Sequence, residues 1–269
     1  YSADSLRFTL MQTTSPGMDV YINEEKFELG RNFGTKLWNA ARFIVSCAEN
    51  SGDTIPWREV ATAEPKLNPE LLNDDDRHIL IACNRMLANV TAALEKYRFQ
   101  DAALAAYDFA WSTFCDRYLE GAKAELRSDN AERRAQKFAI LASVYGKLIR
   151  VLHPFMPFIT EELWHQLGYA GDEESIMTAP WPAELSEEST IKYGLSDDIF
   201  DYVENRHELV TTGRALRTEC KLNPKQEITA VIIAKDQTTV ERLIRDAEAI
   251  KLALRATKLE ISTEGNASG

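Results

Sequence analysis

Residues 31–43 hold the side chains best suited to chemistry, in the order Arg-Asn-Phe-Gly-Thr-Lys-Leu-Trp-Asn-Ala-Ala-Arg-Phe. At about 100° of rotation per helical residue, Asn32, Lys36, Asn39 and Phe43 fall on one arc. Two amides, an ammonium and an aromatic ring on one face can hold unstacked bases through hydrogen bonds to base edges, stacking and a cation near phosphate. The arc is therefore suited to contact with single-stranded nucleic acid.

Two cations lie further round the same helix. Arg31 and Arg42 are placed to meet backbone phosphate. The alternative interpretation is that Phe43 and Trp38 pack on neighbouring helices while the polar side chains are solvated, as amphipathic helices often allow. Periodicity alone leaves both interpretations open.

The helix that positions these residues has its own core stripe. It should run from about Glu24 to Glu49, and its apolar side chains recur every three or four positions on the arc next to the polar one. We expect the buried stripe to consist of Phe33, Leu37, Ala41 and Ile44.

Helical periodicity continues along most of the chain. Asn73, before three aspartates, and Asn130 are helix N-cap signals, and a third helix should begin near Phe99. Pro154 and Pro157 force a break and a new helix, which Gly168 ends. With a short helix over residues 3–13, residues 1–168 predict a helical bundle.

The remaining sequence predicts four further parts. Residues 169–195 should be a surface loop, 196–222 a long helix that completes or links the bundle, and 264–269 a frayed tail. In residues 223–263, between that helix and the tail, the hydrophobic pattern is no longer helical throughout. Two β-branched runs enclose a helical pattern at 238–254. The predicted fold class is thus mainly α, a helical bundle followed by a small C-terminal β-α-β unit.

Composition excludes several classes of protein. The 269 residues carry a net charge of -11, which argues against nonspecific coating of nucleic acid. No apolar run is long enough to span a bilayer, so we expect no membrane insertion. The histidines and cysteines are dispersed, so we predict no metal site. The cysteines should be small buried residues in a reducing compartment: Cys47, Cys83, Cys115 and Cys220.

We find no catalytic constellation. The chain has no Gly-rich phosphate loop and no Gly-x-Ser-x-Gly, His-x-Gly-His or Lys-Met-Ser-Lys-Ser motif. Adjacent Glu161 and Glu162 diverge on a helix, and they are expected to place favourable charge in its first turn. We therefore predict no catalytic and no cofactor-binding residues.

Residues 31–43 closely resemble the first long helix of the anticodon-binding domain in the valyl-tRNA synthetase family, one of the class I aminoacyl-tRNA synthetases. Residues 1–8 resemble the sequence that follows the catalytic Lys-Met-Ser-Lys-Ser loop in class I synthetases for branched aliphatic amino acids. Two further motifs match in order, Leu-His-Pro-Phe-Met-Pro-Phe-Ile-Thr-Glu-Glu-Leu-Trp at 152–164 and Arg-x-Leu-Arg-x-Glu-x-x-Leu-x-Pro at 214–224.

The resemblance implies that Lys36, Asn39 and Phe43 help read the middle and third anticodon bases, A and C for valine codons. Phe43 would stack on a base, while the other two would bind base edges or phosphate. Ala40 would let a base approach the helix, and Arg31 and Arg42 would be weaker candidates for phosphate contact. His153 and the nearby prolines would turn the chain between helices.

The resemblance also implies a larger context. The chain would be a noncatalytic, monomeric and cytoplasmic part of a valine-tRNA ligase, with valine-accepting tRNA as partner and a catalytic domain upstream. ATP and Mg²⁺ would serve that upstream domain. Two alternatives stay open, the equivalent domain of an isoleucyl or leucyl enzyme and a helical protein-docking module that uses exposed aromatics such as Trp38.

Overall fold

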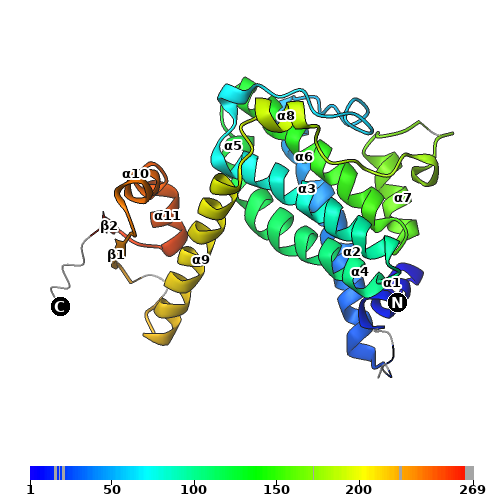
Figure 1. Ribbon diagram of the computed structural model, residues 1–269, viewed down its shortest axis with the longest axis horizontal. Coiled ribbons are helices and arrows are strands. Elements are labelled where there is room, and N and C mark those ends of the chain that lie inside the picture. Colours follow the sequence, from blue (N-terminus) through cyan, green and yellow to red (C-terminus); the bar gives the residue numbers. More distant parts are fainter. Residues whose placement is uncertain (15–16, 18, 20–21, 172, 224–225, 264–269) are drawn as a thin grey trace. The chain divides into compact units, whose positions relative to one another are not determined.

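The structure, a computed structural model, describes residues 1–14, 17, 19, 22–171, 173–223 and 226–263. The chain divides into two compact units, Tyr1–Phe200 and Asp201–Gly269 (Figure 1). Predominantly helical structure with one small sheet confirms the predicted fold class. No helix in the described ranges combines the length and apolar character of a membrane-crossing segment. The predicted tail, 264–269, lies outside the described residues.

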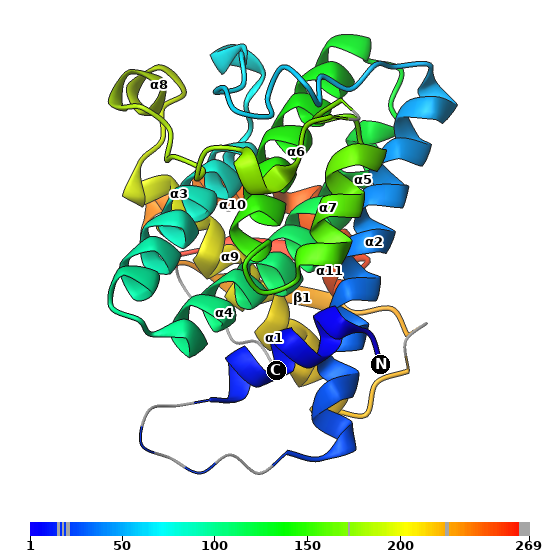
Figure 2. The ribbon, with the colours of Figure 1, turned by 90° about the vertical axis from the view of Figure 1, so that its right-hand side faces the viewer.

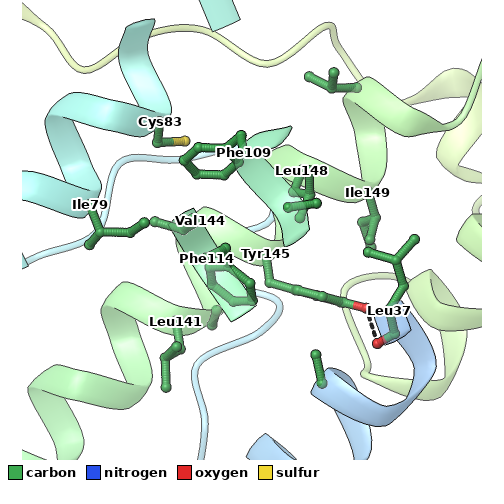
Figure 3. Close-up of a cluster of buried hydrophobic side chains, with 14 of the residues drawn as sticks. Leu37, Ile79, Cys83, Phe109, Phe114, Leu141, Val144, Tyr145, Leu148 and Ile149 are labelled. Atoms are coloured by element: carbon green, nitrogen blue, oxygen red, sulfur yellow. Dashed lines mark hydrogen bonds between the residues drawn. The ribbon is translucent and has the colours of Figure 1, made fainter. Parts of the chain in front are cut away.

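The first unit is a helical bundle around one apolar core. Phe114 and Tyr145 are fully buried, and the Tyr145 hydroxyl donates a hydrogen bond to the Leu37 carbonyl at 2.8 Å (Figure 3). The whole predicted core stripe is buried, which confirms its orientation: Phe33, Leu37, Ala41 and Ile44. The long helices are α2 (Glu24–Ser51), α3 (Asp74–Glu95), α6 (Ala131–Leu152) and the run formed by α4 (Phe99–Asp108), η2 (Phe109–Leu119) and α5 (Glu120–Leu126).

Side-chain caps fix where two of these helices begin. Asn73 accepts a hydrogen bond from the Asp76 backbone N–H at 2.8 Å, and the Asp76 carboxylate accepts one from the Asn73 N–H at 3.2 Å. This reciprocal capping box starts α3. Asn130 accepts from the Arg133 N–H at 3.0 Å and starts α6. Both predicted N-caps are confirmed.

The middle of the third long helix departs from the prediction of a regular α-helix. Eleven residues, Phe109–Leu119, form the π-helical segment η2. Phe109, Phe114 and Leu119 are five residues apart and all are at most 6% exposed. A regular α-helix would rotate such residues about 140° apart, whereas the wider i→i+5 turn stacks them on one face. Core packing therefore accounts for the widened helix.

Helix α1 (Ala3–Thr13) ties α2 to the turn before α7 (Pro157–Gln166). Asp4 accepts hydrogen bonds from the Phe158 and Ile159 backbone N–H groups at 3.1 and 2.7 Å, so it satisfies the start of α7 from another helix. A Cβ added at Gly30 would meet the Ser5 carbonyl at 2.6 Å, which shows how closely α1 and α2 approach. Figure 2 shows α1 beside the beginning of α2.

The segment 169–195 is less irregular than a surface loop. It contains the 3₁₀ turn η3 (Ile176–Thr178) and helix α8 (Glu187–Lys192), while a further 3₁₀ turn, η1 (Pro69–Leu71), precedes α3. Glu161 of α7 accepts hydrogen bonds from the Ser175 hydroxyl at 2.8 Å and the Ile176 N–H at 3.1 Å. Glu161 thus holds this segment on the bundle. The prediction that Glu161 and Glu162 place charge in the first turn of α7 is wrong, because that turn contains no acidic residue.

The second unit holds the predicted β-α-β arrangement. Strands β1 (Thr229–Ile233) and β2 (Lys258–Ser262) pair in parallel, with Thr229 opposite Lys258. Helix α9 (Asp197–Glu219) begins in the first unit and contributes the buried Val203 to the second.

The single helix predicted at 238–254 is in fact two, α10 (Gln237–Arg245) and α11 (Ala247–Leu254). The break falls at Asp246. Its carboxylate accepts a hydrogen bond from the Tyr202 hydroxyl at 2.8 Å and pairs with Arg206. Two partners from α9 therefore fix this residue at the junction.

Candidate nucleic-acid interface

The polar arc of α2 lies on the outside of the bundle. Asn32 and Asn39 are exposed, whereas Lys36 and Phe43 are half-buried. Asn32 and Asn39 make no side-chain hydrogen bond within the described part of the chain, so their amides face solvent. The helical wheel was therefore right to separate this arc from the core stripe.

Lys36 is held by two residues of η2. Its ammonium forms an ion pair with Asp116 and lies 4.3 Å from the centroid of the Trp111 ring. Trp111 stacks on Tyr107 with ring centroids 5.6 Å apart, and Tyr107 meets the buried Phe33 ring at 4.9 Å. The cation therefore rests on an aromatic face that is anchored in the core.

The π-helical geometry explains why these two residues reach the same ammonium. Trp111 and Asp116 are five positions apart, a spacing that the i→i+5 turn aligns and a regular α-helix separates. The same widening that buries Phe114 thus brings an aromatic ring and a carboxylate to α2. π-Helical turns within α-helices are frequently found at functional sites.

Phe43 lies near a second cation. The Lys123 ammonium of α5 is 5.3 Å from the Phe43 ring centroid, and it also pairs with Glu120 at 2.6 Å. Phe43 packs partly against the core, so only part of its ring is open. We call the whole patch the α2–η2 surface, defined by Asn32, Lys36, Asn39, Phe43, Trp111, Asp116 and Lys123.

Charge on and beside the α2–η2 surface is largely compensated. Lys36 and Lys123 each have a carboxylate partner. Arg42, one residue before Phe43, is exposed and has no ion-pair partner within the described ranges. Arg31 pairs with Glu28 at 3.4 Å and lies over the Tyr1 ring at 5.7 Å, away from the patch. Arg42 is thus the better placed arginine for phosphate.

Two of the expectations for α2 need correction. Ala40 is 5% exposed and belongs to the core, so it does not offer a base an open approach to the helix. Trp38 is half-buried and packs against the same core, so it is not the exposed aromatic that the protein-docking alternative names.

The cysteines give no sign of thiolate chemistry. Burial raises the pKa of Cys115 to about 12, with Lys36 opposing and Asp116 adding to the shift. Burial also raises the pKa of Cys47, against the nearby Arg127 and Lys123. Cys220 is exposed, contrary to the prediction that all four cysteines are buried. The described residues include no group of three His, Cys, Asp or Glu side chains arranged to hold a metal ion.

Sequence reasoning missed the η2 and α5 side of the surface. Trp111, Asp116 and Lys123 stand 75 or more positions beyond Lys36, and no pattern shows which helix faces meet. One spacing in the sequence fits a widened turn, since large apolar residues stand five apart at 109, 114 and 119.

Comparison with known proteins identifies the family of the chain. The family model for the anticodon-binding domain of tRNA ligase matches residues 76–233. Valine--tRNA ligase of Rhizobium meliloti (strain 1021) is 36% identical over 263 residues, covering 97% of this chain and 26% of the relative. That of Geobacter sulfurreducens is 35% identical over 266 residues, covering 98% and 28% respectively. Both alignments are long enough to include residues of α2, which precedes the range of the family model.

Among solved structures, a LeuRS chain from a ternary complex with tRNA and LeuAMS, of Agrobacterium radiobacter K84, has a TM-score of 0.49 and 18% identity. The match covers 74% of this chain and 26% of that one. The chain described here spans about a quarter of the length of the curated relatives that it matches. The family model itself covers more than half of the chain, and on that ground the chain belongs to the family of anticodon-binding domains of tRNA ligases.

Proposed function

We propose that this chain is the anticodon-recognition part of a valine–tRNA ligase and that the α2–η2 surface holds unstacked anticodon bases. One observation carries the proposal. Within a domain of the anticodon-binding family, the partly open Phe43 ring shares one outer arc of α2 with Asn39 and with Lys36, whose ammonium lies over the Trp111 ring. Stacking beside hydrogen bonds to base edges is how proteins hold single-stranded RNA.

Each side chain has a role that follows from its surroundings. Phe43 stacks on a base through the open part of its ring, and Asn39 binds a base edge with an amide that both donates and accepts. Asn32 extends the same row by about two helical turns from Asn39. Arg42 meets backbone phosphate, and Arg31 contributes little because Glu28 and Tyr1 already engage it.

Paired charges make the surface selective. Nonspecific attraction to phosphate grows with the number of cations that phosphate can neutralise. Here two of the lysines are already paired with carboxylates, and the chain as a whole is acidic at -11. Binding then depends on base contacts more than on charge, which suits a domain that must distinguish anticodons.

The proposal extends to the whole ligase in outline. Valine activation with ATP and Mg²⁺ belongs to a catalytic domain elsewhere in the polypeptide, and this chain contributes recognition without catalysis. We propose that the protein acts as a monomer in the cytoplasm. The valine--tRNA ligase relatives, at 35–36% identity over nearly the whole chain, support the assignment of the chain to a valine–tRNA ligase.

The assignment to valine is tested by binding of the chain to valine-, isoleucine- and leucine-accepting tRNAs under one set of conditions. We expect the valine tRNA to bind most tightly. Preference for the isoleucine or leucine tRNA would transfer the domain to the corresponding enzyme. Equal absence of binding to all three would contradict anticodon recognition by this chain.

Arg42→Gln should weaken binding about equally for every anticodon and reduce the slope of log affinity against log salt by about 1, because one phosphate contact is lost. Titrations at several salt concentrations measure that slope. Arg31→Gln is the matched control, since the Arg31 guanidinium is occupied by Glu28 and Tyr1. A larger change in slope for Arg31→Gln than for Arg42→Gln would contradict the assignment of Arg42 to phosphate.

A further inference from the structure

We propose that Asp116 reads the exocyclic amino group of one anticodon base, with Lys36 donating to the ring nitrogen beside that group. The inference rests on the proposed function and adds a specificity-determining residue from η2. It makes the Lys36–Asp116 pair a recognition unit for adenine and cytosine, the bases whose amino group lies at C6 of a purine or C4 of a pyrimidine.

The first support is the position of the pair at the outside of the bundle. The Asp116 side chain is 51% exposed although it is paired, and Lys36 is 26% exposed. Within the described part of the chain, Asp116 makes no hydrogen bond except to Lys36. A carboxylate with two oxygens can accept more than one hydrogen bond, so Asp116 keeps acceptor capacity toward solvent.

The second support is that the pair is rigidly presented. Lys36 is fixed from below by the Trp111 ring, which rests on Tyr107 and through it on the buried Phe33. Asp116 stands on the π-helical segment, whose five-residue spacing aligns it with Trp111. The two charged groups therefore meet an incoming base with their positions already set.

The chemistry of the pair is directional. An ammonium only donates hydrogen bonds and a carboxylate only accepts them. Adenine and cytosine each carry an amino group, which is a donor, where guanine and uracil carry a carbonyl oxygen, which is an acceptor. An amino group placed against Asp116 makes a charge-assisted hydrogen bond, and a carbonyl placed there faces a carboxylate that cannot donate to it.

The two discriminating bases for valine fit this chemistry. Valine codons require A in the middle of the anticodon and C at its third position, and both are amino bases. The ribose attachment fixes the orientation of the base edge. Replacement of A by G, or of C by U, therefore puts a carbonyl against Asp116 where the amino group was. Lys36 meanwhile neutralises Asp116, so that the carboxylate does not repel the approaching phosphate backbone.

The test compares the chain with its Asp116→Asn variant on four valine tRNAs. One has the native anticodon, one has the middle A changed to G, one has the third C changed to U, and one has the middle A changed to C, which keeps the amino group. We expect Asp116→Asn to reduce discrimination against one of the two keto exchanges by about 5- to 150-fold, the range given by a 1–3 kcal/mol base contact. The exchange that is relaxed identifies the base.

Three comparisons make this result decisive. Glu120→Gln removes a carboxylate from the same side of the bundle, where it pairs with Lys123, and should leave every ratio unchanged. An amino-conserving exchange, A to C, should be discriminated equally by both proteins. Thermal unfolding should show that Asp116→Asn, at an exposed position, is folded like the unchanged chain.

Equal weakening of all four complexes by Asp116→Asn would show that Asp116 only positions Lys36, and it would overturn the inference. The inference would also be overturned if the unchanged chain discriminates among the four tRNAs and Asp116→Asn has the same affinity ratios. That result would leave the proposed function intact. A parent chain that does not discriminate among the four tRNAs would overturn the proposed function together with this inference.

Discussion

Phe43→Ala is expected to weaken binding to valine tRNA by about 1–3 kcal/mol, the usual effect of removing an aromatic ring on which a base stacks. The ring is half-buried on α2, with Lys123 near it and one part open to solvent. Because every base has a stacking face, the loss should be similar for tRNAs with other anticodons. Titration of labelled tRNA with each protein measures the change in binding free energy.

The partial burial of Phe43 makes a stability control necessary. Phe43→Leu keeps most of the apolar contact with the core and removes the aromatic face, so it should keep most of the stability and lose most of the binding. Urea unfolding gives the free energy of unfolding for both variants. Equal losses of stability and binding in Phe43→Ala, with full binding retained in Phe43→Leu, would make Phe43 a core residue only.

Asp76→Ala should destabilise the bundle by about 3 kcal/mol, because the buried ammonium of Lys137 loses its nearest carboxylate and keeps the longer contact with Glu125, at 3.5 Å. Asp76 and Lys137 side chains are 2% and 3% exposed. Asp76 also accepts a hydrogen bond from the Tyr118 hydroxyl at 2.7 Å and caps α3. The free energy of unfolding in urea measures this loss, with a circular dichroism signal to follow the helices.

A matched pair of controls separates burial from charge. Arg58→Ala breaks the ion pair between Arg58 and Glu174, whose side chains are 64% and 56% exposed. This change should lower the free energy of unfolding by less than about 1 kcal/mol. The double change Asp76→Leu with Lys137→Met removes both buried charges and should be less destabilising than Asp76→Ala alone. If Asp76→Ala proves no more costly than Arg58→Ala, the Asp76–Lys137 pair does not hold the bundle together.

Elements with strong local signals were predictable from the sequence. Helix α1 spans Ala3–Thr13 as predicted, since Ser2 caps it and the apolar period is clear. Strand β1, Thr229–Ile233, lies inside the first of the two predicted β-branched runs, residues 227–234. The core stripe of α2 and its polar arc also followed from periodicity alone, because both depend only on the rotation per residue.

Features that depend on tertiary packing were not predictable in the same way. The π-helical segment follows from how Phe109 and Phe114 fill the core, and the break at Asp246 follows from partners on α9. The pairing of Lys36 with Asp116 requires knowing that α2 lies against η2. The sequence thus predicted half of the α2–η2 surface, the half on one helix, and could not supply the facing half.

The central claim is that this surface reads anticodon bases. Its most direct test is binding of the chain to a valine tRNA and to the same tRNA with the middle A changed to G, at two salt concentrations. We predict tighter binding to the native anticodon by about 1–3 kcal/mol at both salt concentrations, since base contacts survive screening. Equal binding to both tRNAs that falls steeply with salt would show phosphate attraction alone and would contradict base recognition.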